Sequence, residues 1–270
     1  MKQAESSGIS RRRLLGMAGL TAGATLLPRR RFFAAEDGIV ARIVNTGVLK
    51  AGYAEAAPTN ARAEQIAKTY GLDSFSQIEG IRYTFNIAER KLSRTWVWEP
   101  KTDQVSYEGK DRAGEPVKVT YLRSQLGSQA AVVREEIDPA FINDQYWLVF
   151  PFHLIWDSSA KVEETGMHKL PLGKGSAQRV VVRYPPEGYS PGDTWELFVG
   201  TDNRIKEWVY RHGGSEPWMG VWSWEDHRKA GPLLVSLNHP GNREGKPVRV
   251  FFSDVAVKLS GAANTWAKAQ

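Results

Sequence analysis

Apolar and polar residues alternate with a period of two along much of the chain. In residues 81–87, Ile81, Tyr83, Phe85 and Ile87 fall on one face, and the residues between them are polar. Side chains of a β-strand point alternately to its two faces, so this pattern predicts a strand with one buried side.

Comparable short runs recur at intervals of about ten residues, with turn residues between them. The last run is long enough to bend at Ser253-Asp254 or to form two strands there. Strands do not alternate with helices in a βαβ rhythm, which argues against a Rossmann-type or barrel enzyme and indicates an antiparallel meander. The further runs are residues 94–100, 104–109, 116–123, 178–185, 193–200, 204–211, 217–226, 232–238 and 247–259.

Helical spacing appears in two places. Thr59 or Asn60 is suited to cap a helix that continues to Tyr70, and Gly71 is suited to end it. The second place is residues 138–157, in which twelve of twenty residues are apolar or aromatic.

The sequence of residues 138–157 predicts a bulky helix followed by an extended segment. Asp138 can cap free N–H groups at its start. Pro151 lacks an N–H and biases Phe150 away from helical angles, so we expect the helix to end there and residues 152–156 to be extended. Such a helix can fill the core of a sheet or form the wall of an apolar pocket, and the sequence leaves both open.

The order of these elements predicts a mainly β fold of the α+β class. A first meander, a mid-chain helix and a second meander suggest one strongly curved antiparallel sheet, an incomplete β-barrel, with helices covering its concave side. Residues 36–270 are expected to form this single half-barrel domain.

Residues 1–35 resemble an export signal of the twin-arginine type, and we do not expect them to be part of the fold. Arg11, Arg12 and Arg13 precede an uncharged run at residues 14–27, and small residues stand at Ala34-Ala35. The run is too short to span a bilayer comfortably, so we expect cleavage near Ala35 and a periplasmic protein.

The signal segment changes how the charge is interpreted. The whole chain has 36 Lys and Arg against 30 Asp and Glu, a net charge of +6. Residues 1–35 contain seven of the basic residues and one acidic residue, which leaves 29 of each sign in the remainder. A formally neutral domain gives no support to nucleic-acid binding.

The sequence shows no compact catalytic signature. It contains no cysteine, which excludes disulfides, zinc–thiolate sites and a cysteine nucleophile. GxSxG, HExxH and Walker motifs are also absent, so we expect no catalytic residue, no metal site and no cofactor. Asn143-Asp144, embedded in apolar sequence, need a partner such as an arginine or backbone N–H groups if they are buried.

Tryptophan is the most informative feature of the composition, with ten in the chain. Among them, Trp96, Trp98, Trp195, Trp208, Trp222 and Trp224 fall on predicted strands. Aromatic rings on a curved sheet can fill a core, or line a cavity that accepts an acyl chain, a quinone or a sugar.

Together with this strand order, the runs WVWEPKTDQVSYEG and FINDQYWLVFPFHL resemble the periplasmic lipoprotein-carrier superfamily, the LolA, LolB and LppX-like proteins, in a branch of exported bacterial proteins. The resemblance covers most of residues 60–260 and implies a non-catalytic protein that shields acyl chains in an apolar cavity. The strand faces are tryptophan-rich where such carriers are mainly aliphatic, and Arg82 and Arg94 match the release arginine of those carriers by position only. By position, the resemblance implies ligand-binding residues Trp96, Trp98, Tyr107, Phe141, Tyr146, Trp147, Phe150 and Trp208.

Three functions follow from these patterns. The first is an exported protein that binds a lipid or other apolar ligand as carrier or sensor, with envelope proteins or the membrane surface as further partners and no nucleic acid. The second is an exported hydrolase or metal-dependent enzyme, which requires His212, His227 or His239 to converge with Asp144 or Asp226. The third is an interaction module with tryptophans exposed outside the concave face.

Overall fold

The computed structural model describes residues 61–187, 190–214, 217–261 and 265–270, which lie within one compact unit. The predicted signal at residues 1–35 and the capping residues Thr59 and Asn60 lie outside the described residues. No helix in the described ranges is both long enough and apolar enough to cross a membrane.

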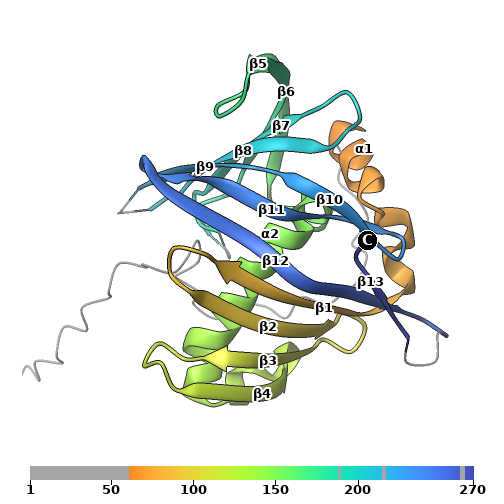
Figure 1. The fold of residues 1–270 in the computed structure, drawn as a ribbon, viewed down its shortest axis with the longest axis vertical. Helices are drawn as coiled ribbons and strands as arrows, with labels where there is room; N and C mark the ends of the chain where they lie inside the picture. The colour runs from red at the N-terminus through yellow and green to blue at the C-terminus, as the bar shows by residue number, and fades with distance from the viewer. Residues whose placement is uncertain (1–60, 188–189, 215–216, 262–264) are drawn as a thin grey trace, which may run out of the picture. The chain divides into compact units, whose positions relative to one another are not determined.

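The first meander has four strands, preceded by a short helix and a 3₁₀ turn (Figure 1). Helix α1 begins the described chain, and Gly71 follows it with φ 105°, as the predicted stop requires. A Cβ at Gly71 would lie 2.6 Å from the Pro232 carbonyl oxygen, so there is no room for a side chain at this position. The elements are α1 (Ala61–Thr69), η1 (Leu72–Gln77), β1 (Ile78–Ile87), β2 (Leu92–Glu99), β3 (Gln104–Lys110) and β4 (Pro116–Leu122).

The second meander follows the mid-chain helix and continues the same sheet. Strand β12 passes through Ser253-Asp254 without ending, with a register shift there and φ 54° at Asp254, so it bends and does not divide. The elements are η2 (Arg123–Ser128), η3 (Val133–Ile137), α2 (Asp138–Trp156), β5 (Lys161–Lys169), β6 (Ser176–Arg183), β7 (Thr194–Val199), β8 (Ile205–Arg211), β9 (Met219–Ser223), β10 (Glu225–Ala230), β11 (Leu233–Arg243), β12 (Lys246–Leu259) and β13 (Trp266–Lys268).

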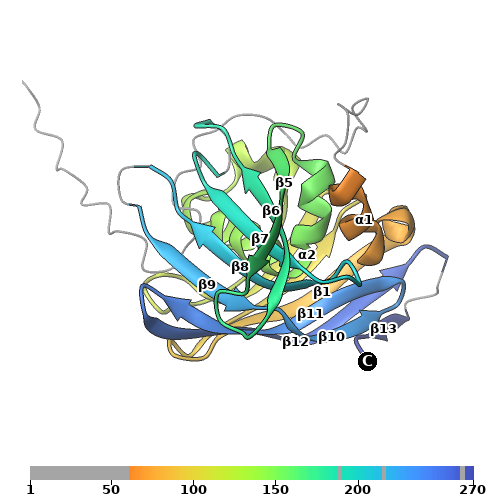
Figure 2. The same ribbon diagram turned by 90° about the horizontal axis from the view of Figure 1, so that it is seen from above.

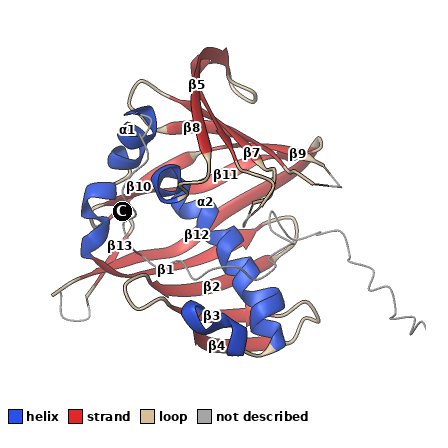
Figure 3. Cartoon of the chain, turned by 180° about the vertical axis from the view of Figure 1, so that it is seen from behind, coloured by secondary structure: helices blue, strands red, loops and turns tan. Residues whose placement is uncertain are grey.

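The strands form one antiparallel sheet that is strongly curved and does not close. Its order through the described residues is β4-β3-β2-β1-β12-β11-β9-β8-β7-β6-β5, with β10 paired to β11 and β13 to β12. Helix α2 lies within the curve and α1 beside one end of it (Figures 2 and 3). The fold class expected from the sequence, an incomplete barrel with helices on its concave side, is confirmed.

The alternation in β1 explains which face of the sheet is buried. Ile81, Tyr83 and Phe85 are at most 1% exposed, whereas Arg82 and Asn86 are only partly buried. The alternating apolar side therefore faces α2, and the resulting core extends along the whole concave face.

The predicted end of the central helix at Pro151 is wrong. Helix α2 continues to Trp156 and only bends, with an irregular residue at Val149 (φ −120°, ψ 17°). Pro151 removes one backbone hydrogen bond, but the residues beyond it bury large rings: those of Phe152 and Trp156 lie 5.2 and 4.7 Å from Phe75. The helix places these two side chains one turn apart on the face that packs against Phe75, so tertiary packing outweighs the local effect of proline.

The predicted capping role of Asp138 is also wrong. A turn of π-helix, Val133–Ile137, leads directly into α2, so Asp138 has helical neighbours on both sides and makes no capping bond. Its carboxylate is fully buried and instead accepts hydrogen bonds from Tyr121 Oη at 2.9 Å and Arg123 Nε at 2.8 Å. The acidic residue therefore joins the helix to the end of the first meander.

Candidate functional site

All eight predicted ligand-binding residues lie at the interface between α2 and the sheet, within one apolar core. Helix α2 provides Phe141, Tyr146, Trp147 and Phe150, and the strands provide Trp96 and Trp98 (β2), Tyr107 (β3) and Trp208 (β8). Except for the partly buried Trp98, none is more than 5% exposed.

These rings divide into two groups along the helix. Near its start, Phe141 has its ring centroid 5.5 Å from that of Trp96 and 5.9 Å from that of Trp98, and Trp96 lies 4.5 Å from Tyr107. Farther along, Trp147 and Phe150 lie 4.8 and 5.3 Å from Trp208, and Phe150 lies 5.8 Å from Tyr146. The rings contact one another directly, so the helix fills the concave face in this conformation.

Several aromatic residues at the same interface were not named as site residues from the sequence. Trp195 lies 5.2 Å from Phe150, and Trp222 lies 4.9 Å from Trp147. Both side chains lie on the sides of β7 and β9 that face the helix. The two-residue alternation of apolar positions in these strands is the sequence signal that could have identified them. His239 also belongs to this interface, at 5.6 Å from Trp147.

Asp144 on α2 forms a fully buried ion pair with Arg94 of β2. Two parallel bonds join them, from Arg94 Nε to Oδ2 at 2.8 Å and from a terminal guanidinium nitrogen to Oδ1 at 2.7 Å. Trp96 Nε1 and Asn143 Nδ2 donate to the same carboxylate at 2.8 and 2.9 Å. Burial raises the pKa of Asp144, and the Arg94 charge and these hydrogen bonds oppose that rise. The arginine partner expected for Asn143-Asp144 is thus present.

Asp157, directly after α2, ties the other end of the helix to the second meander. It accepts hydrogen bonds from Tyr146 Oη at 2.7 Å and Tyr184 Oη at 2.6 Å, and His153 Nδ1 lies 3.1 Å away. Burial raises the pKa of this carboxyl, but the His153 charge and the hydrogen bonds outweigh it, so the pKa lies below 3.8. Helix α2 is therefore anchored near both ends by carboxylates.

The lowered pKa of Asp157 predicts how stability changes with pH. A carboxyl whose pKa is lower when folded stabilises the fold above its unfolded pKa, and this is lost as pH falls through the folded pKa. At pH 6 we expect Asp157→Asn to lower the free energy of unfolding by about 2 kcal/mol, because charged hydrogen bonds are lost. Below the ordinary value of 3.8, the difference from wild type should shrink.

Urea unfolding of both proteins between pH 2.5 and about 7 measures this difference. Asp226→Asn is the matched control, since Asp226 pairs with Arg228 at the surface. A difference that stays constant on acidification would show that Asp157 does not act through its charge.

The residues required by the enzymatic alternative do not converge. No group of three His, Asp or Glu side chains suited to hold a metal occurs in the part of the chain that the structure describes. Each side chain has its own surroundings: His212 Nδ1 lies 3.2 Å from Asp193, His227 bonds Tyr70 Oη at 2.9 Å, His239 is buried among rings, Asp144 pairs with Arg94, and Asp226 pairs with Arg228.

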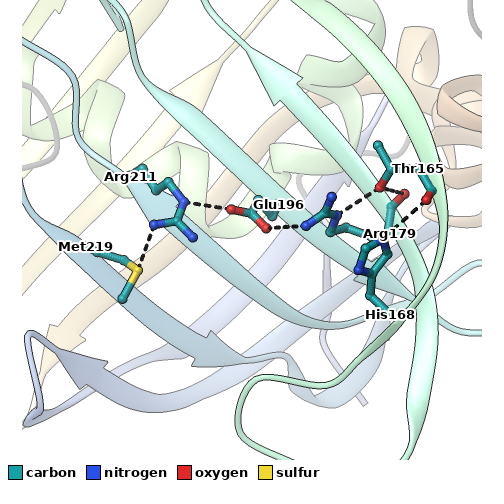
Figure 4. Close-up of polar contacts among 6 residues, drawn as sticks. All are labelled: Thr165, His168, Arg179, Glu196, Arg211 and Met219. Carbon is teal, nitrogen blue, oxygen red and sulfur yellow. Dashed lines mark hydrogen bonds and ion pairs between the residues drawn. The ribbon is translucent and has the colours of Figure 1, made fainter.

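The outer face of β5–β9 carries a chain of polar contacts (Figure 4). Glu196 accepts hydrogen bonds from Arg179 at 3.2 Å and Arg211 at 2.7 Å, and Arg179 continues to Thr165 at 2.8 Å. The exposed large apolar residues of the described ranges, Met167, Leu172 and Met219, are not aromatic. The tryptophan patch required by the third function is therefore not found on this surface.

Comparisons with known proteins give fold similarity alone. No family model matches the chain, and no curated protein matches it in sequence. A DUF1329 family protein from Desulfovibrio piger is similar in structure at 8% identity and TM-score 0.40, with 77% of this chain and 95% of that chain covered. A domain from Vibrio parahaemolyticus assigned to outer membrane lipoprotein sorting is similar at 9% identity and TM-score 0.40, with 75% and 95% covered.

At this TM-score and identity, neither structure carries an argument about what the chain binds.

Proposed function

We propose that this chain is an exported, non-catalytic protein that binds a lipid or other apolar ligand between α2 and the concave face of the sheet. The observation that supports this is the aromatic interface itself, in which large rings of α2 face large rings of an open sheet. The proposal includes export to the periplasm by the twin-arginine route. This part rests on the sequence of residues 1–35, which lie outside the described residues.

A ligand would take the place of α2 side chains, because these now fill the concave face. The helix is suited to such a displacement, since it is irregular at Val149 and its fixed position depends on buried polar pairs. A buried ion pair stabilises less than apolar packing of similar volume, but it defines one geometry. The pairs of Asp144 and Asp138 would thus set a discrete closed position that ligand binding opens.

Native mass spectrometry of the protein purified from a cell-envelope fraction without detergent tests this function. We expect an added mass that disappears on solvent extraction and is identified as a lipid. Fatty acids or phospholipids added to the extracted protein should then change its tryptophan fluorescence, because rings of the interface would move. A clean apoprotein mass, together with no fluorescence response, would contradict the proposal.

A further inference from the structure

Five aromatic side chains, from α2, β8, β9, the β9–β10 connection and β11, form a ring cluster within the interface. Trp147 of α2 covers it, with its ring 4.8 Å from Trp208 and 4.9 Å from Trp222, which oppose each other on β8 and β9. Trp224, between β9 and β10, lies 5.2 Å from Trp208 and 4.9 Å from His239 of β11. None of the five is more than 3% exposed.

Three polar atoms in this ring cluster are buried without a hydrogen-bond partner: Trp208 Nε1, Trp224 Nε1 and His239 Nδ1. The indole of Trp222 differs, because its Nε1 donates to the Val248 carbonyl oxygen at 3.2 Å. Buried polar atoms are almost always paired, and each one without a partner leaves a desolvation cost uncompensated. A polar group bound among these rings would pair with all three atoms.

The proton positions give the chemistry of that group. Both indoles can only donate. His239 Nε2 lies 3.3 Å from the Ser236 carbonyl oxygen, which only accepts, so Nε2 carries the proton. Burial lowers the pKa of His239 to about 3, although the backbone carbonyls of Ser236 and Ser223 oppose this, so the ring is neutral at neutral pH. Nδ1 is therefore an acceptor, in the same ring cluster as two indoles that can only donate.

We propose that the ring cluster binds the hydroxyl group of a neutral amphiphile, with Trp208 and Trp224 donating to its oxygen and His239 Nδ1 accepting its proton. This rests on the proposed function and names the polar part of the ligand. A hydroxyl satisfies donors and acceptor together, which an ether or ester oxygen does not. A carboxylate or ammonium head would be buried without a counter-charge, since none of the five side chains is charged at neutral pH.

Entry to the ring cluster depends on Trp147. Pro151 has no N–H and cannot donate to the Trp147 carbonyl, and the helix is irregular at Val149 between them. The weakest turn of α2 is thus the one that holds the covering ring. An alkyl chain entering along α2 would displace Trp147 and bring its terminal hydroxyl to the three unpartnered atoms.

The test compares dodecan-1-ol with its methyl ether, which keeps the chain and the oxygen but lacks the proton. Affinities are measured by displacement of the apolar dye N-phenyl-1-naphthylamine, so that substitution of tryptophans does not alter the signal itself. We expect the extracted wild-type protein to bind the alcohol about tenfold more tightly than the ether, as one buried hydrogen bond allows.

The variants Trp208→Phe, Trp224→Phe and His239→Phe are expected to reduce that preference to about twofold or less, through loss of affinity for the alcohol. Trp222→Phe is the matched control, because it changes the same kind of ring where the N–H is already paired, and it should keep the preference. Comparing two ligands on one protein removes any general effect of a variant on the fold.

The outcomes separate the two proposals. Equal binding of alcohol and ether by the wild type, or a preference that survives in all three variants, would overturn the hydroxyl site while leaving an apolar carrier. Failure of the wild-type protein to bind the dye or either ligand would overturn the proposed function, and the hydroxyl site with it.

Discussion

Replacing Asp144 with alanine is expected to lower the free energy of unfolding by about 3–5 kcal/mol. The guanidinium of Arg94, only 9% exposed, would remain in the core without its counter-charge. The indole N–H of Trp96 and the amide of Asn143 would lose the same acceptor. The loss therefore arises mainly from unpaired partners and not from the volume of the deleted carboxylate.

The double variant Arg94→Met with Asp144→Leu separates these causes. With both charges removed, no unpaired charge remains, but Trp96 Nε1 and Asn143 Nδ2 still lack their acceptor. We therefore expect the double variant to recover about 2 kcal/mol relative to Asp144→Ala without reaching wild-type stability. Glu108→Ala provides a surface control, since its partner Lys118 is 81% exposed, and no measurable change is expected. Urea unfolding followed by tryptophan fluorescence measures all of these; a double variant as unstable as Asp144→Ala would refute the explanation.

The double variant also bears on function. If the Arg94–Asp144 pair fixes one closed position of α2, its removal should leave a stable fold whose helix is less uniquely seated. Such a protein would take up apolar dye more readily than wild type under conditions in which both are fully folded. We therefore expect stability and ligand uptake to respond differently to removal of the Arg94–Asp144 pair. The two charges determine the position of α2 more than they contribute to the net free energy of folding.

The sequence predicted the sheet well because its signal is local. In β1, the alternation of Ile81, Tyr83 and Phe85 directly records which face is buried. Strand β5 was missed, since residues 161–169 alternate poorly and contain Gly166 at φ 88° next to a register shift. An edge strand with one weakly buried face leaves little pattern in the sequence.

For features that depend on residues distant in the sequence, the type of interaction could be predicted but the partner residue could not. Asp144 within an apolar run predicted a buried partner, but the partner, Arg94, is fifty residues away and nothing local identifies it. Similarly, Pro151 predicted a helix end, and packing of Phe152 against Phe75 overrode it. Alternation shows on which face of a strand an aromatic ring lies. It does not show whether the space between the concave face and α2 is empty or filled by side chains, so this property of the interface could not be predicted.

Phe150→Ala is expected to lower the free energy of unfolding by about 3–5 kcal/mol, because it leaves a void at the centre of the interface. Its ring is fully buried and lies 5.2 Å from Trp195 and 5.3 Å from Trp208. Phe251→Ala is the matched control; that ring is only partly buried under Arg249 on the other face of the sheet, and about 1 kcal/mol or less should be lost.

The void of Phe150→Ala also offers a direct probe of ligand binding, since an apolar cavity in a protein core stays dry and binds small aromatic molecules. Benzene should therefore raise the melting temperature of Phe150→Ala and leave the wild type and Phe251→Ala unchanged. Thermal unfolding with and without benzene measures this. A variant that loses little stability, or one that benzene does not stabilise, would mean that α2 collapses into the space. The concave face would then close on itself and could not hold an apolar ligand in place of a side chain.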